Sequence, residues 1–256
     1  MAAISIQNLT VRFGDVLAVD NASLDIGEGE FVSIVGPSGC GKTTILNILT
    51  GLVPPTQGSV SLLGHTPAVG HPDVAYMLAR DSLLPWRSAL GNASYGLEIR
   101  GVAEAERLKR AAALLAEVGL KGFENHYPKM LSHGMRQRCA LARTFCLDSR
   151  VMLMDEPFGA LDAQTKLQLE DLLLRLWSEH RRTVVFITHD LAEAVALSDR
   201  VIVMSARPGR IIADMRIELD RPRSVRALQK DRHFLDIYAQ VWSKLEEGLG
   251  NTEVIA

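Results

Sequence analysis

Apolar residues along this chain gather in short runs, and longer amphipathic stretches separate the runs. Four of the runs have the length of strands and are rich in β-branched or aromatic residues, a pattern typical of strands buried on both faces. They are Phe31–Val35, Val151–Met154, Thr183–Ile187 and Arg200–Met204. Helices are predicted between them over Ala163–Glu179 and Leu191–Leu197. Strands that alternate with helices favour an α/β fold with a mostly parallel core sheet.

The rest of the chain has a different pattern. Further short strands are predicted over Ile4–Val11, Ala22–Ile26, Ser59–Leu63 and Val74–Ala79. From about Trp86 to Leu147 the pattern is mostly helical, because apolar residues recur at helical spacing between Leu108 and Val118. This stretch, about residues 87–147, is best interpreted as a helical subdomain inserted into the sheet. We therefore predict one domain over residues 1–220 and a helical tail over residues 221–256.

The tail carries a stripe of apolar residues. Phe234, Ile237, Val241 and Leu245 fall on one helical face, which predicts that this face packs on the core. The basic run Arg221-Pro222-Arg223, with Arg226, precedes it and is predicted to be a solvated loop, with contact to anionic lipid as the alternative.

Gly36–Thr43 follows the first buried strand, precedes a helix and fits the pattern G-x-x-x-x-G-K-[ST]. A strand, a glycine-rich turn and a helix N-terminus direct several backbone N–H groups at one point, which suits a phosphate chain. In this pattern the Lys42 ammonium reaches the β- and γ-phosphates, and the Thr43 hydroxyl ligates Mg²⁺. The chain is therefore predicted to bind a nucleoside triphosphate. The predicted contacts are Gly36, Pro37, Ser38, Gly39, Cys40, Gly41, Lys42, Thr43 and Thr44.

Two adjacent carboxylates follow another of the buried strands. Asp155 and Glu156 come directly after Val151–Met154, so both lie at the carboxyl end of that strand. Because Mg²⁺ takes only one or two protein ligands, Asp155 is the carboxylate predicted to hold it beside Thr43, through a bridging water. Glu156 is then free to polarise the water that attacks the γ-phosphate.

Composition narrows the class of protein. A net charge of −2 gives no electrostatic reason to expect nucleic-acid binding. Cys40, Cys139 and Cys146 are too few and too scattered for a disulfide framework or a zinc site, and a free thiol at Cys40 favours a reducing cytosol. Neither a signal peptide nor an apolar run of the roughly 18 residues that span a bilayer is predicted. If the protein works at a membrane, another chain must hold it there.

Several further motifs resemble a known family. Leu131–Arg138 resembles the signature motif of ATP-binding cassette (ABC) transporter ATPases, and Gly159–Asp162 resembles their D-loop. His189 matches their switch histidine, and Phe13 matches the aromatic residue on which adenine stacks. The motifs stand in the family's order from about Ile4 to Ile212. Within the family, the Leu83–Arg87 and Arg136–Arg143 stretches look like the corresponding stretches of importers of nitrate, sulfonate, taurine or bicarbonate.

The resemblance implies a P-loop NTPase fold with an antiparallel β-subdomain, and a head-to-tail dimer that binds two ATP molecules. Each ATP would lie between the phosphate loop of one subunit and Ser132, Gly134 and Asp162 of the other. Glu156 and His189 would be catalytic. The dimer would consist of two copies of this chain or of the chain and a related ATP-binding subunit.

The same resemblance implies a transport role. The protein would hydrolyse ATP at the cytoplasmic face of the inner membrane and drive membrane-spanning permease subunits. An extracytoplasmic substrate-binding protein would take part indirectly, and no nucleic acid is expected. Trp86 is predicted to lie where the permease docks or in the core.

Two positions depart from the family pattern. The family has a glutamine, which touches Mg²⁺ and the attacking water, where this chain has Ala79. Arg80 and Asp81 would point elsewhere on a continuing strand, so slower hydrolysis or weaker coupling is predicted, unless Mg²⁺ replaces the ligand with water. His133 stands where the signature has its first glycine. Its ring would donate a hydrogen bond to phosphate or point to solvent without effect.

Two alternatives remain open at this stage. The chain would be a non-hydrolytic or regulatory cassette paired with a competent partner, which Ala79 favours and Glu156 and His189 oppose. It would otherwise be a soluble ABC ATPase outside transport, although neither a second cassette nor long coiled coils are present.

Overall fold

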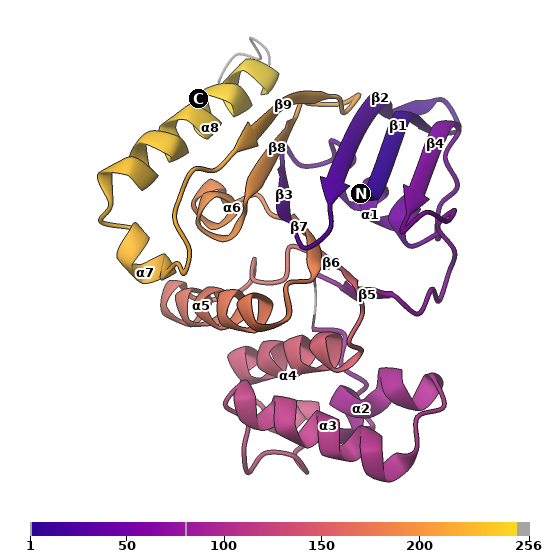
Figure 1. The fold of residues 1–256 in the computed structure, drawn as a ribbon, viewed down its shortest axis with the longest axis vertical. Helices are drawn as coiled ribbons and strands as arrows, with labels where there is room; N and C mark the ends of the chain where they lie inside the picture. Colours follow the sequence, from indigo (N-terminus) through magenta and orange to yellow (C-terminus); the bar gives the residue numbers. More distant parts are fainter. Residues whose placement is uncertain (1, 80, 250–256) are drawn as a thin grey trace.

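The core of the computed structural model, which describes residues 2–79 and 81–249, is a six-stranded sheet in the order β5-β6-β7-β3-β8-β9 (Figure 1). Neighbouring strands are parallel except for β9, which pairs antiparallel with β8 at one edge. The strands are β3 (Phe31–Val35), β5 (Val74–Met77), β6 (Val151–Asp155), β7 (Thr183–Ile187), β8 (Arg200–Met204) and β9 (Ile211–Arg216). The predicted buried strands are confirmed, whereas the edge strand β9 was not predicted.

Both faces of the core sheet are covered, which explains why its strands are apolar throughout. Alternate residues point to opposite faces: Phe31 and Val35 pack in one apolar cluster, and Val32 and Ile34 pack in the other. The helices α5 (Ala163–His180) and α6 (Leu191–Leu197) belong to the first cluster. Helix α1 (Lys42–Leu49) belongs to the second.

A separate three-stranded antiparallel sheet, in the order β2-β1-β4, shares the second cluster with α1 (Figure 1). Its strands are β1 (Ala2–Phe13), β2 (Val16–Gly27) and β4 (Gln57–Leu62). Strands β1 and β2 are each longer than predicted and form a hairpin with Phe13 opposite Val16 at its turn. The hairpin therefore brings an aromatic side chain to the end of the core sheet where α1 begins.

A helical lobe projects from the sheet between β5 and β6 (Figure 1). It contains α2 (Ala89–Ile99), α3 (Glu104–Glu117), the 3₁₀ turn Pro128–Met130 and α4 (His133–Cys146). Of the residues at helical spacing, Ala111, Leu115 and Val118 are fully buried against the neighbouring helices. Trp86 lies just before this lobe and is 71% exposed, so it is not a core tryptophan.

The C-terminal part consists of α7 (Val225–Leu228) and α8 (Arg232–Leu249). As predicted, Phe234, Ile237 and Val241 are buried against the core. The prediction of a solvated loop before α7 is wrong. Arg221 donates to the Leu197 carbonyl at 2.7 Å, and Arg223 donates to the Ser198 and Leu219 carbonyls, both at 2.7 Å. The guanidinium groups bind carbonyls at the C-terminal end of α6 and after β9, which holds the loop against the core.

Candidate nucleotide-binding site

The phosphate loop joins the end of β3 to α1, and Gly41 caps the helix with φ +99°. This left-handed conformation suits glycine, and it turns successive backbone N–H groups toward one point. Lys42 is 6% exposed, and its Nζ donates to the carbonyls of Gly36 at 2.8 Å and Pro37 at 3.0 Å. The ammonium therefore lies inside the loop, where phosphate oxygens would compete with these two carbonyls for it.

A cavity of about 350 Å³ opens beside this loop. Phe13 is 50% exposed and lies at its edge, so the ring is available for a base to stack on. The cavity brings together eight of the predicted site residues. They are Phe13, Ser38, Gly39, Gly41, Lys42, Thr43, Thr44 and Glu156. Gly36, Pro37 and Cys40 belong to the same loop but do not line the cavity, and burial raises the pKa of the Cys40 thiol.

Thr43 and Asp155 lie together at the base of the site. The Thr43 hydroxyl donates to Asp155 Oδ2 at 3.0 Å and lies 3.2 Å from Oδ1. Burial raises the pKa of the Asp155 carboxyl, because it disfavours the charged form. A cation beside the carboxyl would act in the opposite direction and favour the ionised form. One hydroxyl and one carboxylate are hard oxygen donors, which fits Mg²⁺ that keeps waters and phosphate oxygens as its other ligands.

Glu156 follows Asp155 in a left-handed conformation, with φ +45°. This conformation costs roughly 1 kcal/mol for a residue with a side chain, and a backbone hydrogen bond from Glu156 to the Ile187 carbonyl at 2.9 Å holds it. The turn brings Glu156 Oε2 to 3.2 Å from His189 Nδ1, at the end of β7. The carboxylate therefore faces both the cavity and the histidine, as a base that activates water would.

Ser132, Gly134 and Asp162 do not line the cavity. Ser132 is the N-cap of α4 and accepts from the Met135 N–H at 3.3 Å. Asp162 is the N-cap of α5 and accepts from the Thr165 N–H at 3.0 Å, a bond that lowers the pKa of its carboxyl. Both residues present the start of a helix outside the site formed by their own chain.

The positions that depart from the family pattern lie in unstrained backbone. Ala79 is exposed in a bend after β5, because the strand ends at Met77 and not at Ala79 as predicted. Asp81 accepts from Arg136 Nε at 2.8 Å, and Arg80 lies outside the described residues. His133 is the first residue of α4 and has no positive φ, so its side chain causes no backbone strain there.

Known proteins identify this arrangement. A family profile described as ABC transporter matches residues 19–159. An uncharacterised ABC transporter ATP-binding protein of Methanocaldococcus jannaschii is 45% identical over 241 residues, covering 91% of this chain and 90% of the relative. The chain belongs to the ABC transporter ATP-binding family.

Other relatives of this ABC cassette include two ATP-binding proteins named for taurine import. The taurine import ATP-binding protein TauB of Jannaschia sp. is 39% identical over 272 residues, covering 100% of both chains. TauB of Shigella flexneri is 37% identical over 248 residues, covering 95% of this chain and 97% of the relative. One solved structure that matches is an ATP-binding cassette, a dimer in a post-hydrolysis state bound to ADP and Pi. Its TM-score is 0.74 and its identity is 33%, and the match covers 85% of this chain and 100% of that chain.

These comparisons confirm the predicted family and the predicted P-loop α/β fold. The cassette is an ATP-binding subunit of the ABC transporter class. Within residues 2–79 and 81–249, no helix combines the length and apolar character that crossing a bilayer requires.

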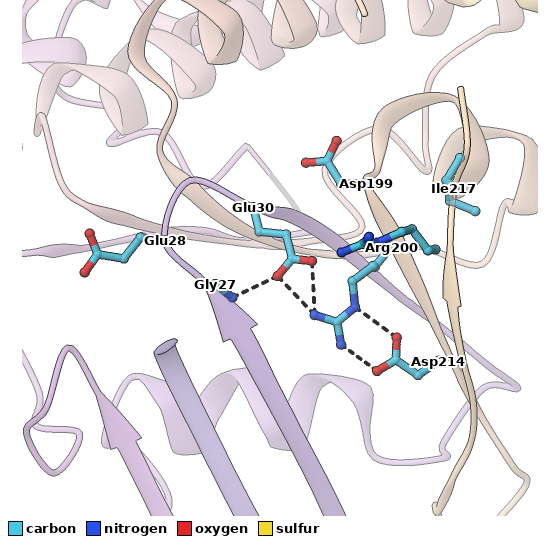
Figure 2. A pocket seen from close by; sticks show the side chains of 8 residues that line it. Gly27, Glu28, Glu30, Asp199, Arg200, Asp214 and Ile217 are labelled. Atoms are coloured by element: carbon cyan, nitrogen blue, oxygen red, sulfur yellow. Dashed lines mark hydrogen bonds and ion pairs between the residues drawn. The ribbon is translucent and has the colours of Figure 1, made fainter. Parts of the chain in front are cut away.

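A second cavity of about 670 Å³ lies at the other end of the core sheet, where β3 and β8 begin (Figure 2). Figure 2 shows the Arg200 guanidinium between two carboxylates: its Nη1 donates to Glu30 at 3.0 Å and its Nε to Asp214 at 3.0 Å. The hydrogen bonds that Arg200 donates to Asp214 and then to Glu30 raise the pKa of its guanidinium. Because two carboxylates already pair with this one guanidinium, the three groups carry a net negative charge, and this cavity is a weaker candidate for a phosphate ligand than the one beside Lys42.

A buried charged network behind His189 was not predicted from the sequence. Lys166 Nζ on α5 donates to Asp190 Oδ2 at 2.8 Å and lies 3.7 Å from Glu193 and 3.9 Å from Glu170. Thr188 donates to Glu193 Oε2, whereas Glu193 Oε1 lacks a hydrogen-bond partner among the described residues. The network links α5 to the segment that carries His189. A lysine and a glutamate four residues apart on a helix are the only signal in the sequence, and such pairs are common on helix surfaces.

This network predicts a pH-dependent stability. Burial raises the pKa of Glu170 to about 7 and that of Glu193 to about 8, from 4.5 in both cases. The folded state therefore holds protons that the unfolded state has already lost, and the stabilisation is complete below pH 4.5 and disappears as the pH rises through 7 to 8. We expect the free energy of unfolding to fall by about 1 to 3 kcal/mol between roughly pH 5 and 8.

The measurement is thermal unfolding across this pH range for the wild type, Glu193→Gln and the control Glu247→Gln. Glu193→Gln should reduce the slope because its amide does not titrate, whereas Glu247 is exposed on α8 and its variant should keep the wild-type slope. An unchanged slope in Glu193→Gln would contradict this assignment.

Proposed function

We propose that this cassette binds ATP with Mg²⁺, hydrolyses it to ADP and phosphate, and powers an importer of small anions of the nitrate, sulfonate, taurine or bicarbonate type. The observation that carries the proposal is the Glu156–His189 pair, 3.2 Å apart at the edge of the phosphate-loop cavity. The TauB relatives, which match over nearly their full length, support the importer assignment.

In this proposal each residue has a defined task. Lys42 and the backbone N–H groups of the loop bind and orient the phosphates. Thr43 and Asp155 would hold Mg²⁺, which supplies positive charge against the phosphate oxygens. Glu156 accepts a proton from the attacking water, and His189 orients Glu156 and the terminal phosphate. Phe13 stacks on the adenine.

Dimerisation completes the site. Ser132, Gly134 and Asp162 lie outside their own chain's cavity at the starts of α4 and α5, so a second subunit would present them to the nucleotide. The amino end of a helix carries partial positive charge, which favours a phosphate beside Ser132. Hydrolysis would remove this contact, and the halves would separate. The dimeric solved cassettes support this arrangement.

The permease subunits would hold the cassette at the cytoplasmic face of the inner membrane. The exposed Trp86, just before the helical lobe, is the proposed contact with them, since tryptophan is enriched in protein interfaces. The extracytoplasmic binding protein would act through the permease. We place the boundary of the ATPase domain at residue 220, with a helical tail after it.

The test of this function is the ATPase rate of the cassette alone and reconstituted with its permease in lipid vesicles, with Mg²⁺ or with EDTA. We expect Mg²⁺-dependent hydrolysis that rises several-fold with the permease. Hydrolysis without permease stimulation would favour an ABC ATPase outside transport. ATP binding without hydrolysis in either setting would favour the regulatory cassette, the alternative that the apolar Ala79 supports.

Ala79→Gln and His133→Gly test whether the site is weakened. Because alanine offers no polar group to the attacking water, Ala79→Gln is expected to raise the stimulated ATPase rate about tenfold. His133→Gly is expected to change it less than threefold, since the backbone at His133 is already helical. ATP affinity should stay the same in both variants. If neither substitution raises the rate of an active homodimer, the weakened-site hypothesis is wrong.

A further inference from the structure

A turn from the C-terminal half of the core closes one side of the nucleotide cavity. Arg207 follows β8 and lines this cavity together with the phosphate loop, more than 160 residues earlier in the chain. None of the family motifs or predicted contacts included it. Its position depends on how the segment between β8 and β9 packs.

The turn is fixed against the phosphate loop and against β2. Gly209 donates its N–H to the Ala18 carbonyl at 3.0 Å, and its own carbonyl accepts from the Asp20 N–H at 2.9 Å. A β-carbon at Gly209 would lie 1.9 Å from the Cys40 carbonyl oxygen, so only glycine allows the two loops to come this close. The backbone that carries Arg207 is therefore held in place before any ligand arrives.

The Arg207 guanidinium lies over the phosphate loop. Its Nε is 3.4 Å from the Gly39 carbonyl oxygen, at the outer limit of a hydrogen bond, and Nη2 is 3.3 Å from the place that a β-carbon on Gly39 would occupy. Arg207 is exposed, and within the described ranges it forms no ion pair with a carboxylate. Arg210, three residues later, is by contrast paired with Asp20 at 2.5 Å.

We propose that Arg207 is a nucleotide-binding residue, whose guanidinium contacts the phosphate chain beside Gly39. This inference rests on the proposed ATP-binding function and adds a contact to the same site. An unpaired guanidinium beside a phosphate-binding loop has the charge and the planar donor geometry that phosphate oxygens match. Because the guanidinium lies beside Gly39, which belongs to the phosphate loop, the expected contact is with the phosphates and not with the base.

The test is isothermal titration calorimetry of the full-length protein with Mg²⁺-ADP and Mg²⁺-GDP at low and high salt. Arg207→Ala is expected to weaken both nucleotides equally, about five- to tenfold, since the contact is to the phosphates that they share. Arg207→Lys, which keeps the charge, should recover affinity to within about threefold of wild type. The loss in Arg207→Ala should shrink at high salt because the contact is screened.

Arg210→Ala is the matched control, because it removes an arginine from the same turn whose charge Asp20 already neutralises; it should bind within twofold of wild type. Wild-type affinity in Arg207→Ala would overturn the proposal, and so would a loss confined to ADP or one that Arg207→Lys does not recover. Lys42→Ala separates this failure from a failure of the proposed function. If Lys42→Ala abolishes binding and Arg207→Ala does not weaken it, only the role of Arg207 is wrong.

Discussion

Replacing Glu156 by glutamine is expected to lower the ATPase rate at least about 100-fold while ATP affinity changes little. Glutamine has nearly the same shape, and the backbone bond from residue 156 to the Ile187 carbonyl does not depend on the side chain. Its amide cannot accept the proton of the attacking water at neutral pH, whereas the carboxylate beside His189 can. The rate falls because activation of the water is lost, not because the site unfolds.

The same variant should make dimerisation visible. Because ATP is bound and not consumed, Mg²⁺-ATP is expected to shift Glu156→Gln, alone or with its partner subunit, to a dimer in size-exclusion chromatography. Glu246→Gln serves as the control, since Glu246 is exposed on α8 far along the chain from the site, and its rate should equal that of the wild type. An active Glu156→Gln would show that another group activates the water.

Replacing Lys42 by alanine is expected to weaken ATP binding at least about 100-fold, or roughly 3 kcal/mol. The substitution removes a buried ammonium from the centre of the phosphate loop. It also leaves the carbonyls of Gly36 and Pro37, which Lys42 Nζ contacts at 2.8 and 3.0 Å, pointing into the site without a donor. These carbonyls would then repel the phosphate oxygens that the ammonium attracts.

The measurement is a titration of the full-length variant with Mg²⁺-ATP, with the melting temperature recorded in parallel. Lys244→Ala is the control, because Lys244 pairs with Glu247 on the surface of α8, away from the phosphate loop, and its loss should leave affinity unchanged. A folded Lys42→Ala protein with wild-type affinity would show that the nucleotide binds elsewhere.

The contiguous parts of the site could be predicted from the sequence. The phosphate loop and the Asp155-Glu156 pair each lie at the end of an apolar strand, and local sequence dictates both strand and turn. Strand β7 likewise predicts that His189 lies at a strand end. Whether these three strand ends are neighbours depends on the sheet order, in which β6 and β3 both flank β7.

Other parts depend on contacts between segments far apart in the chain. Arg207 lines the cavity because its turn packs against β2 and against Cys40, and nothing near Arg207 in the sequence indicates these contacts. Arg221 and Arg223 look like a solvated basic run, but they bind carbonyls at and beyond the end of α6. Strand β9 was not predicted because it is a half-buried edge strand with a weak apolar pattern. Its pairing with β8, which the sequence does not show, stabilises it as a strand.

The sequence by itself therefore determined the family, the α/β class and the chemistry of the phosphate loop, because each is encoded in a short stretch whose spacing has a direct physical meaning. The tertiary structure decided which strand ends meet at the cavity and which charges are neutralised. It also decided which charges, like that of Arg207, form no ion pair among the described residues. The reason is physical: hydrogen bonding and turn geometry act between near neighbours, whereas burial and charge pairing depend on whichever segments the fold brings together.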